Sequence, residues 1–129
     1  MRVVKDDEIE AEKRRHRPLM QRFAAAFTAG DVDAVMLCLA PKFEWHLPDG
    51  KVFKDRKAVR SALDQRLNSA SGPQFSNVTF RYHGDTVIQT YDVRVKGAGS
   101  KMRHTRGLDV YRISNGLIAR KDAYWKFFD

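Results

Sequence analysis

Apolar side chains recur at helical spacing in the first third of the chain and predict an amphipathic helix. Leu19, Phe23 and Phe27 follow one another every four residues. The helix is expected to end at Gly30, the residue type that most readily terminates a helix. Pro18 marks either the first turn or a kink, so the polar residues before it form an arm or an extension of the helix.

Two further helices are predicted by an aspartate cap followed by apolar residues on one face. Asp31 can cap the first of them, and Pro41 is expected to stop it. Its apolar face would carry Val32, Val35, Met36 and Leu39. Asp55 can cap the other helix, whose apolar face would carry Val59, Leu63 and Leu67.

The second half of the chain is rich in β-branched and aromatic residues, a pattern typical of strands. Long strands are predicted over residues 75–83, 86–96, 102–113 and 117–127, and a short strand over 43–47 precedes them. Helices followed by a meander of antiparallel strands indicate an α+β fold, with the helices packed on one face of a sheet.

Side chains alternate along a strand, which predicts the residues that face the helices. In 43–47 the inward set is Phe43, Trp45 and Leu47, so His46 is interpreted as an outward residue, and Asp49 as part of a turn. The more apolar face of 86–96 carries Val87, Gln89, Tyr91, Val93 and Val95. In 117–127 one face carries Ala119, Lys121, Ala123, Trp125 and Phe127, and the other carries Ile118, Arg120, Asp122, Tyr124 and Lys126.

Asp109 is unusual because it lies in the middle of a predicted strand, where aspartate is disfavoured. If Ser114–Gly116 is a three-residue loop, Asp109 lies opposite Lys121; if Asn115-Gly116 is a two-residue turn, it lies opposite Asp122. We favour the three-residue loop because like charges directly opposite are unfavourable. The Asp109–Lys121 pair is then either a surface ion pair or a polar pair inside a cavity, and the sequence leaves both open.

The composition is that of one globular domain. The chain has 129 residues, of which 43% are hydrophobic, and a net charge of +8. No apolar run reaches the roughly 18 residues of a membrane helix, and no secretory signal is visible, so we expect a cytoplasmic protein without a membrane partner. Apart from residues 13–17, the basic side chains are scattered, so nucleic acid is not an expected partner.

The residue types that bind metals or form disulfides are sparse. Cys38 is the single cysteine, lies in an apolar stretch and is expected to be a buried thiol. The histidines show no ligand spacing: His16, His46, His83 and His104. We therefore expect no metal and no cofactor.

Three stretches resemble the nuclear transport factor 2-like superfamily: RFAAAFTAGDVDAV (22–35), LAPKFEWHLPDG (39–50) and DVYRISNGLIARKDAYW (109–125). The resemblance covers roughly residues 18–127, and the superfamily includes ketosteroid isomerases, SnoaL-like polyketide cyclases, scytalone dehydratases and limonene epoxide hydrolases. It implies a cone-shaped, curved, mostly antiparallel (mixed) sheet wrapped around three N-terminal helices, a cystatin-like α+β barrel. Residues 1–17 would be a polar basic arm or helix extension, and 18–129 a single domain.

The catalytic groups of the relatives are only partly present. The ketosteroid isomerase pattern has a tyrosine where this chain has Phe23, and an aspartate that acts as the general base where this chain has Leu47. Its second aspartate, which is protonated, matches Asp109. The limonene epoxide hydrolase pattern needs an Arg-x-Asp where this chain has Tyr91-Asp92-Val93, and a late aspartate where it has Ala123. The chain thus resembles these families without the full catalytic set of either.

The resemblance implies a pocket for a small apolar molecule. Its expected substrate-binding residues are Phe23, Phe27, Trp45, Leu47, Gln89, Tyr111 and Trp125. As an isomerase, cyclase or hydratase acting on an apolar carbonyl or polycyclic compound, the protein would use Asp109 as the acid–base group, Lys121 to tune it and Tyr91 to orient the substrate. The alternative is a non-catalytic ligand-binding or interaction module. A homodimer is expected in either case, through the outer sheet face with Leu108, Val110, Ile118 and Tyr124.

Overall fold

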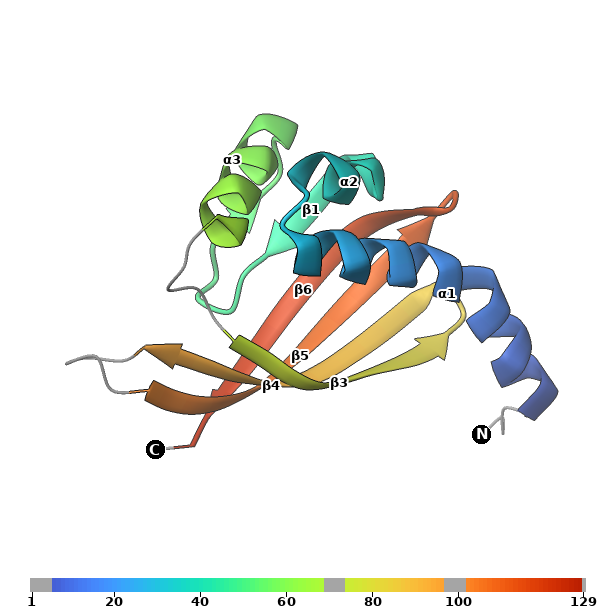
Figure 1. Ribbon diagram of the computed structural model, residues 1–129. Coiled ribbons are helices and arrows are strands. Elements are labelled where there is room, and N and C mark those ends of the chain that lie inside the picture. The colour runs from blue at the N-terminus through green and yellow to red at the C-terminus, as the bar shows by residue number, and fades with distance from the viewer. Residues whose placement is uncertain (1–5, 69–73, 97–101, 129) are drawn as a thin grey trace.

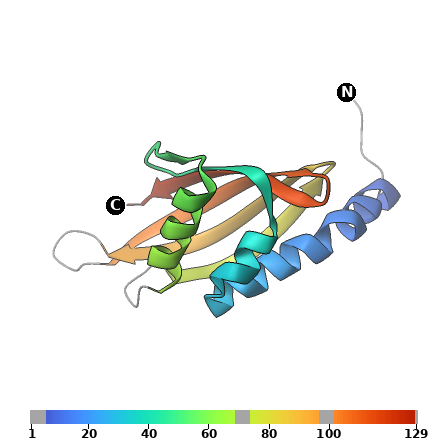
Figure 2. The same ribbon diagram turned by 90° about the horizontal axis from the view of Figure 1, so that it is seen from above.

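Three helices lie on one face of a six-stranded sheet in the computed structural model, which describes residues 6–68, 74–96 and 102–128 (Figures 1 and 2). The helices are α1 (Asp6–Ala29), α2 (Val32–Leu37) and α3 (Arg56–Leu67). The strands are β1 (Leu39–His46), β2 (Val52–Phe53), β3 (Gln74–His83), β4 (Thr86–Lys96), β5 (Met102–Ser114) and β6 (Leu117–Phe127). The α+β class expected from the sequence is confirmed.

The sheet has the order β2-β1-β6-β5-β4-β3. β1 and β6 are parallel, and the other neighbouring pairs are antiparallel, so the sheet is mixed. The meander β3–β6 is the one that the sequence predicts, with strand ends within one residue of those expected. The short strand β2 was not predicted; it pairs with the end of β1 through Trp45 and Phe53.

Helix α1 continues through Pro18, so the polar residues from Asp6 onward extend the amphipathic helix. This extension projects beyond the end of the sheet (Figures 1 and 2). It is not fully solvated, because His16 is buried and its Nε2 lies 3.0 Å from Oδ1 of Asp85 in the β3–β4 turn. The division of the chain into an arm or helix extension, residues 1–17, and a single domain, residues 18–129, stays a prediction.

The expected aspartate caps are present in both later helices. Asp31 accepts a hydrogen bond from the Ala34 amide (3.1 Å), and Asp55 accepts one from the Lys57 amide (3.2 Å). The predicted extent of the second helix was wrong, because α2 ends at Leu37 and Pro41 lies within β1. Leu39 instead pairs with Ile118 of β6, and residues 44–46 pair with residues 120–122, so long-range strand pairing replaces the helix.

The core lies between the helices and the inner face of the sheet. The buried residues include most of the predicted apolar faces, among them Leu19, Phe23, Val35, Val59 and Leu63. In β1, Phe43 and Trp45 point inward as expected, whereas His46 lies outward beside Glu44, 3.0 Å from its carboxylate. Val87 and Val93 are buried as predicted, and the side chain of Val95 lies outside the described residues.

The favoured register of the final hairpin was wrong. Asn115 and Gly116 both have positive φ (52° and 75°) and form a two-residue turn between Ser114 and Leu117. A β-bulge then shifts the pairing between Ile113 and Arg112, so Asp109 lies opposite Ala123 and Tyr111 lies opposite Lys121. Asp109 and Lys121 therefore share the inner face but meet diagonally.

The same bulge explains why the predicted orientation of Ile118 was wrong. Strict alternation put this residue on the outer face, yet its side chain is 0% exposed and belongs to the core. The pairing passes from Ile118 to Arg120 and leaves Ala119 as the extra residue of β6. Because one residue is inserted, Ile118 and Lys121 both point inward, which alternation forbids.

Candidate functional site

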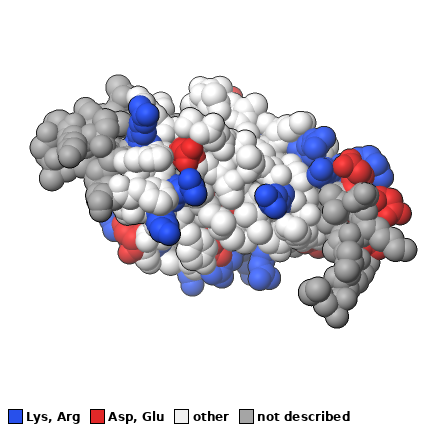
Figure 3. All heavy atoms as spheres, turned by 90° about the horizontal axis from the view of Figure 1, so that it is seen from below, with Lys and Arg blue, Asp and Glu red and all other residues white. Residues whose placement is uncertain are grey.

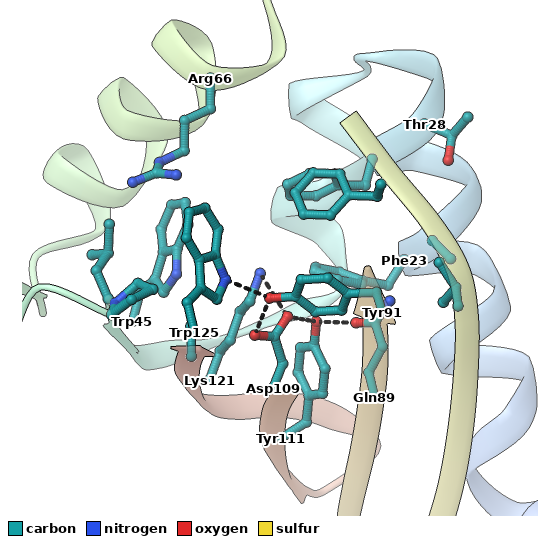
Figure 4. A pocket seen from close by; sticks show the side chains of 17 residues that line it. Phe23, Thr28, Trp45, Arg66, Gln89, Tyr91, Asp109, Tyr111, Lys121 and Trp125 are labelled. Carbon is teal, nitrogen blue, oxygen red and sulfur yellow. Dashed lines mark hydrogen bonds and ion pairs between the residues drawn. The ribbon is translucent and has the colours of Figure 1, made fainter. Parts of the chain in front are cut away.

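A cavity of about 290 Å³ opens between the helices and the inner face of the sheet. Figure 4 shows its lining side chains converging from helices and strands. The walls are mainly aromatic and aliphatic, and the polar or charged groups are few. The cavity is lined by Phe23, Ala24, Phe27, Thr28, Trp45, Leu47, Pro48, Arg66, Phe75, Val78, Gln89, Tyr91, Asp109, Tyr111, Lys121, Ala123 and Trp125.

Every residue that the sequence analysis assigned to the pocket lines this cavity. The strands supply the polar ones, since β4, β5 and β6 lie side by side and each turns alternate side chains inward. The catalytic and substrate-binding roles of these residues stay predictions. Arg66, Thr28, Phe75 and Val78 are lining residues that the sequence analysis missed.

Asp109 is buried, with 3% of its surface exposed, and carries the only carboxylate among the described residues that line the cavity. Its Oδ1 accepts a hydrogen bond of 2.8 Å from the Tyr91 hydroxyl. Its Oδ2 lies 3.7 Å from the Lys121 ammonium and 3.4 Å from the Tyr111 hydroxyl. These partners compensate the buried charge that a mid-strand aspartate introduces.

Tyr91 links the carboxylate to Trp125. Its oxygen accepts a hydrogen bond of 2.9 Å from Trp125 Nε1, while its proton points to Asp109. Burial and the neighbouring Asp109 raise the pKa of Tyr91 far above its usual value, so the phenol stays protonated at neutral pH and remains a donor. This arrangement fixes the position of the carboxylate more than it offers the phenol to a ligand.

Gly107 makes room for this contact. It lies opposite Tyr91 in one direction and opposite Trp125 in the other, so both side chains pass over the same backbone position. A Cβ on Gly107 would lie 2.1 Å from Cε2 of Tyr91. A glycine inside a strand often marks such a close approach, a signal that was present in the sequence.

Tyr111 and Gln89 form a second polar contact on the cavity floor. The Tyr111 hydroxyl donates a hydrogen bond of 2.7 Å to Gln89 Oε1. Burial and the nearby Asp109 raise the pKa of Tyr111 well above its usual value. Two protonated phenols therefore flank one carboxylate.

Lys121 is buried among aromatic rings. Its Nζ lies 5.3 Å from the ring centres of Phe27 and Trp45, with Phe23 and Tyr111 at 5.9 and 5.7 Å. Burial lowers the pKa of Lys121, and the attraction of Asp109 opposes that shift. The ammonium is held by one carboxylate and by the electron-rich ring faces.

Arg66 lies in the last turn of α3, and its guanidinium carbon is 5.1 Å from the Trp45 ring centre. It follows Val59 by seven residues, which is two helical turns, and so lies on the apolar face of the helix. That spacing could have identified it as a pocket residue. Burial lowers its pKa, and Asp49 opposes this effect.

In the part of the chain that the structure describes, no three His, Cys, Asp or Glu side chains come close enough to hold a metal ion. Over the same residues, no helix combines the length and apolar character required to span a membrane.

A helix-covered mixed sheet enclosing an apolar cavity defines the protein as a nuclear transport factor 2-like α+β pocket fold. The model of the SnoaL-like domain matches residues 20–121, and the chain belongs to this family. A search of the curated protein sequences finds no significant match.

Solved structures with the same fold support this assignment. A candidate polyketide cyclase from Xanthomonas campestris pv. campestris is 25% identical, with a TM-score of 0.73 over 89% of this chain and 93% of that chain. A protein of unknown function from Burkholderia pseudomallei K96243 is 17% identical, with a TM-score of 0.74 over 87% and 91% of the two chains. TerC, co-crystallised with polyporic acid, is 14% identical, with a TM-score of 0.72 over 87% and 92%.

Proposed function

We propose that the protein binds a small apolar carbonyl or polycyclic compound in this cavity and acts on it by acid–base chemistry, as a cofactor-independent isomerase, cyclase or hydratase. The observation that carries the proposal is the buried Asp109 carboxylate, fixed by Tyr91 and paired with Lys121 in an aromatic cavity. Perturbed ionisable groups that converge in an apolar pocket are typical of catalytic sites.

In the proposed reaction each of these groups has its own role. With a carbonyl compound in the cavity, Asp109 Oδ2 removes a proton from the carbon beside the carbonyl, since Oδ1 is occupied by the Tyr91 hydroxyl. The Lys121 ammonium stabilises the negative charge that develops on the carbonyl oxygen. Asp109 then returns the proton to another atom of the product. Tyr91 and Trp125 keep the carboxylate in place.

Two structural neighbours support this proposal: one is described as a candidate polyketide cyclase, and the other, TerC, was co-crystallised with polyporic acid. A second candidate is a non-catalytic binding protein. It is favoured by Phe23 and Leu47, which line the cavity where the ketosteroid isomerase pattern has a tyrosine and an aspartate.

Replacing Asp109 by Asn separates the two candidates. The enzyme is expected to lose turnover by a factor of roughly 10² to 10⁴, because the amide cannot accept the proton. A binding protein would keep its affinity within a few-fold. The matched control is Asp122→Asn, since Asp122 pairs with Arg120 instead of entering the cavity.

A panel of apolar ketones and polycyclic carbonyl compounds should be incubated with each variant. Products would be separated by liquid chromatography, which resolves isomers, and identified by mass spectrometry, and binding would be measured by calorimetry. Unchanged turnover in Asp109→Asn would disprove the acid–base role. No binding of any compound to the unmodified protein would disprove the pocket function itself.

We also propose a homodimer through the outer face of the sheet. Figure 3 shows a broad uncharged area on this face, with separate Lys and Arg side chains and a few Asp or Glu side chains within and around it. Leu108 and Tyr124 lie opposite one another there, 36% and 59% exposed, with Val110 beside them. Ile118 is excluded from this patch because it is buried.

A further inference from the structure

Arg66 brings a second positive charge to the cavity, apart from the Asp109–Lys121 pair. Figure 4 shows its guanidinium on the α3 side of the cavity, near Trp45, whereas the Asp109 carboxylate lies in the middle of the side-chain cluster beside Lys121 and Tyr91. Asp49 attracts the guanidinium through space, but Arg66 forms no ion pair with any residue that the structure describes. Among these residues, no carboxylate is in direct contact with the guanidinium.

The charges of the lining residues do not balance. Asp109 and Lys121 neutralise each other, so Arg66 leaves one excess positive charge around an apolar cavity. A half-buried charge that only a through-space attraction to Asp49 and an aromatic ring compensate is unfavourable, and an incoming anion would reduce that penalty. A singly charged anion matches the excess.

The guanidinium is also suited to one kind of anion. Its carbon lies 5.1 Å over the Trp45 ring, and none of the described residues takes a hydrogen bond from its N–H groups, so these stay available to a ligand. A planar carboxylate accepts two such bonds from an arginine. A phosphate dianion would exceed the available charge and would call for further donors.

The remainder of the cavity indicates the size and the apolar character of the rest of the ligand. Its walls are aromatic, with Phe23, Phe27, Trp45 and Trp125 around the central space. The volume of about 290 Å³ lies at the low end of the range known for ligand pockets. A compound of two or three rings fits such a space better than a larger one.

We propose that the pocket takes the monocarboxylate of an apolar, ring-containing compound, with the carboxylate on Arg66 and the rings directed toward Asp109 and Lys121. The inference rests on the proposed function, because it uses the same cavity. It adds the substrate class and the direction in which the substrate lies: the reacting carbon belongs to the end remote from the carboxylate.

The test compares two probes of the same shape by calorimetry: 2-naphthoate, which is anionic, and 2-acetylnaphthalene, which is a neutral carbonyl compound. The full chain is expected to bind 2-naphthoate about tenfold or more tightly than 2-acetylnaphthalene, since a bond to a charged group is involved. Arg66→Met keeps the packing on Trp45 and is expected to abolish this preference. Arg60→Met is the matched control: Arg60 is on the same helix, pairs with Asp33 and does not line the cavity.

The possible outcomes show separately whether the carboxylate inference and the proposed pocket function hold. Preference lost in Arg66→Met and kept in Arg60→Met supports the inference. Equal binding of both probes to the full chain overturns the inference but leaves the pocket function standing. Binding of neither probe overturns both. If thermal melting shows that Arg66→Met is unfolded, Arg66→Lys decides: a carboxylate preference reduced several-fold supports the inference, and an unchanged preference overturns it.

Discussion

Gly107 has no side chain, and its lack of a Cβ lets Tyr91 and Trp125 meet over the middle of β5. The two ladder partners of this glycine are Tyr91, which donates a hydrogen bond to the Asp109 carboxylate, and Trp125, which donates one to the Tyr91 oxygen. At the scale of single residues, the site therefore depends on one position where nothing larger than hydrogen fits and on one tyrosine that stays protonated.

Replacing Gly107 by Ala is expected to lower the free energy of unfolding by about 1–3 kcal/mol, because the new Cβ would overlap the Tyr91 ring. In a Tyr91→Ala background the same change should have little effect or be stabilising, since alanine is favoured over glycine within a strand. Urea denaturation of the four proteins in this cycle measures the coupling. An equal loss in both backgrounds would contradict the proposed contact.

The raised pKa of Tyr91 has a consequence at alkaline pH. A group whose pKa is higher in the folded chain contributes stability that is complete below its unfolded pKa of about 10 and is lost as the pH rises above it. The unmodified protein should therefore lose stability more steeply above about pH 10 than Tyr91→Phe does. Urea denaturation at a series of pH values tests this, and parallel profiles for the two proteins would exclude it.

At the scale of secondary structure, α3 contributes side chains both to the core and to the lining of the cavity. Its apolar face buries Val59 and Leu63, and the same face carries Arg66 to Trp45 in the last turn. The helix begins at the Asp55 cap, so the cap influences both the packing and the position of the guanidinium.

Replacing Asp55 by Ala is expected to reduce the free energy of unfolding by about 1 kcal/mol, because the first turn of α3 loses an acceptor for the Lys57 amide. The control is Asp64→Ala, an exposed position within the same helix that caps nothing. Chemical denaturation compares the two variants. If Asp64→Ala destabilises the protein as much as Asp55→Ala does, the cap is not the cause.

At the scale of the whole molecule, the sheet has two faces with different chemistry. The inner face meets the helices and lines the cavity, whereas the outer face carries Leu108, Val110 and Tyr124. An apolar patch on an open sheet face is a candidate interaction surface. The proposed dimer would cover this patch and leave the cavity on the opposite side of the sheet.

Val110→Lys should convert the proposed dimer into a monomer, since it places a charge in the centre of the patch. Asp122 lies directly opposite Val110, so the lysine gains a cross-strand partner and the fold is expected to remain intact. Light scattering coupled to size-exclusion chromatography measures the mass. Gln65→Lys adds the same charge on an exposed part of α3 and should leave the mass unchanged. A dimer that persists in Val110→Lys would exclude this patch.

The sequence by itself determined the helices, the strand order along the chain and the inward set of aromatic and polar residues, because spacing along a helix or strand decides which side chains share a face. Asp109 was placed on the inner face with Tyr91 and Lys121 through a hairpin register that was wrong and through the family resemblance, and neither predicted the contacts between these side chains. Only the tertiary structure decided the rest: the early end of α2, the bulge at Ala119 that turns both Ile118 and Lys121 inward, and the approach of Arg66 to Trp45. Each of these depends on pairing or packing between segments far apart in the chain, and local periodicity carries no information about such contacts.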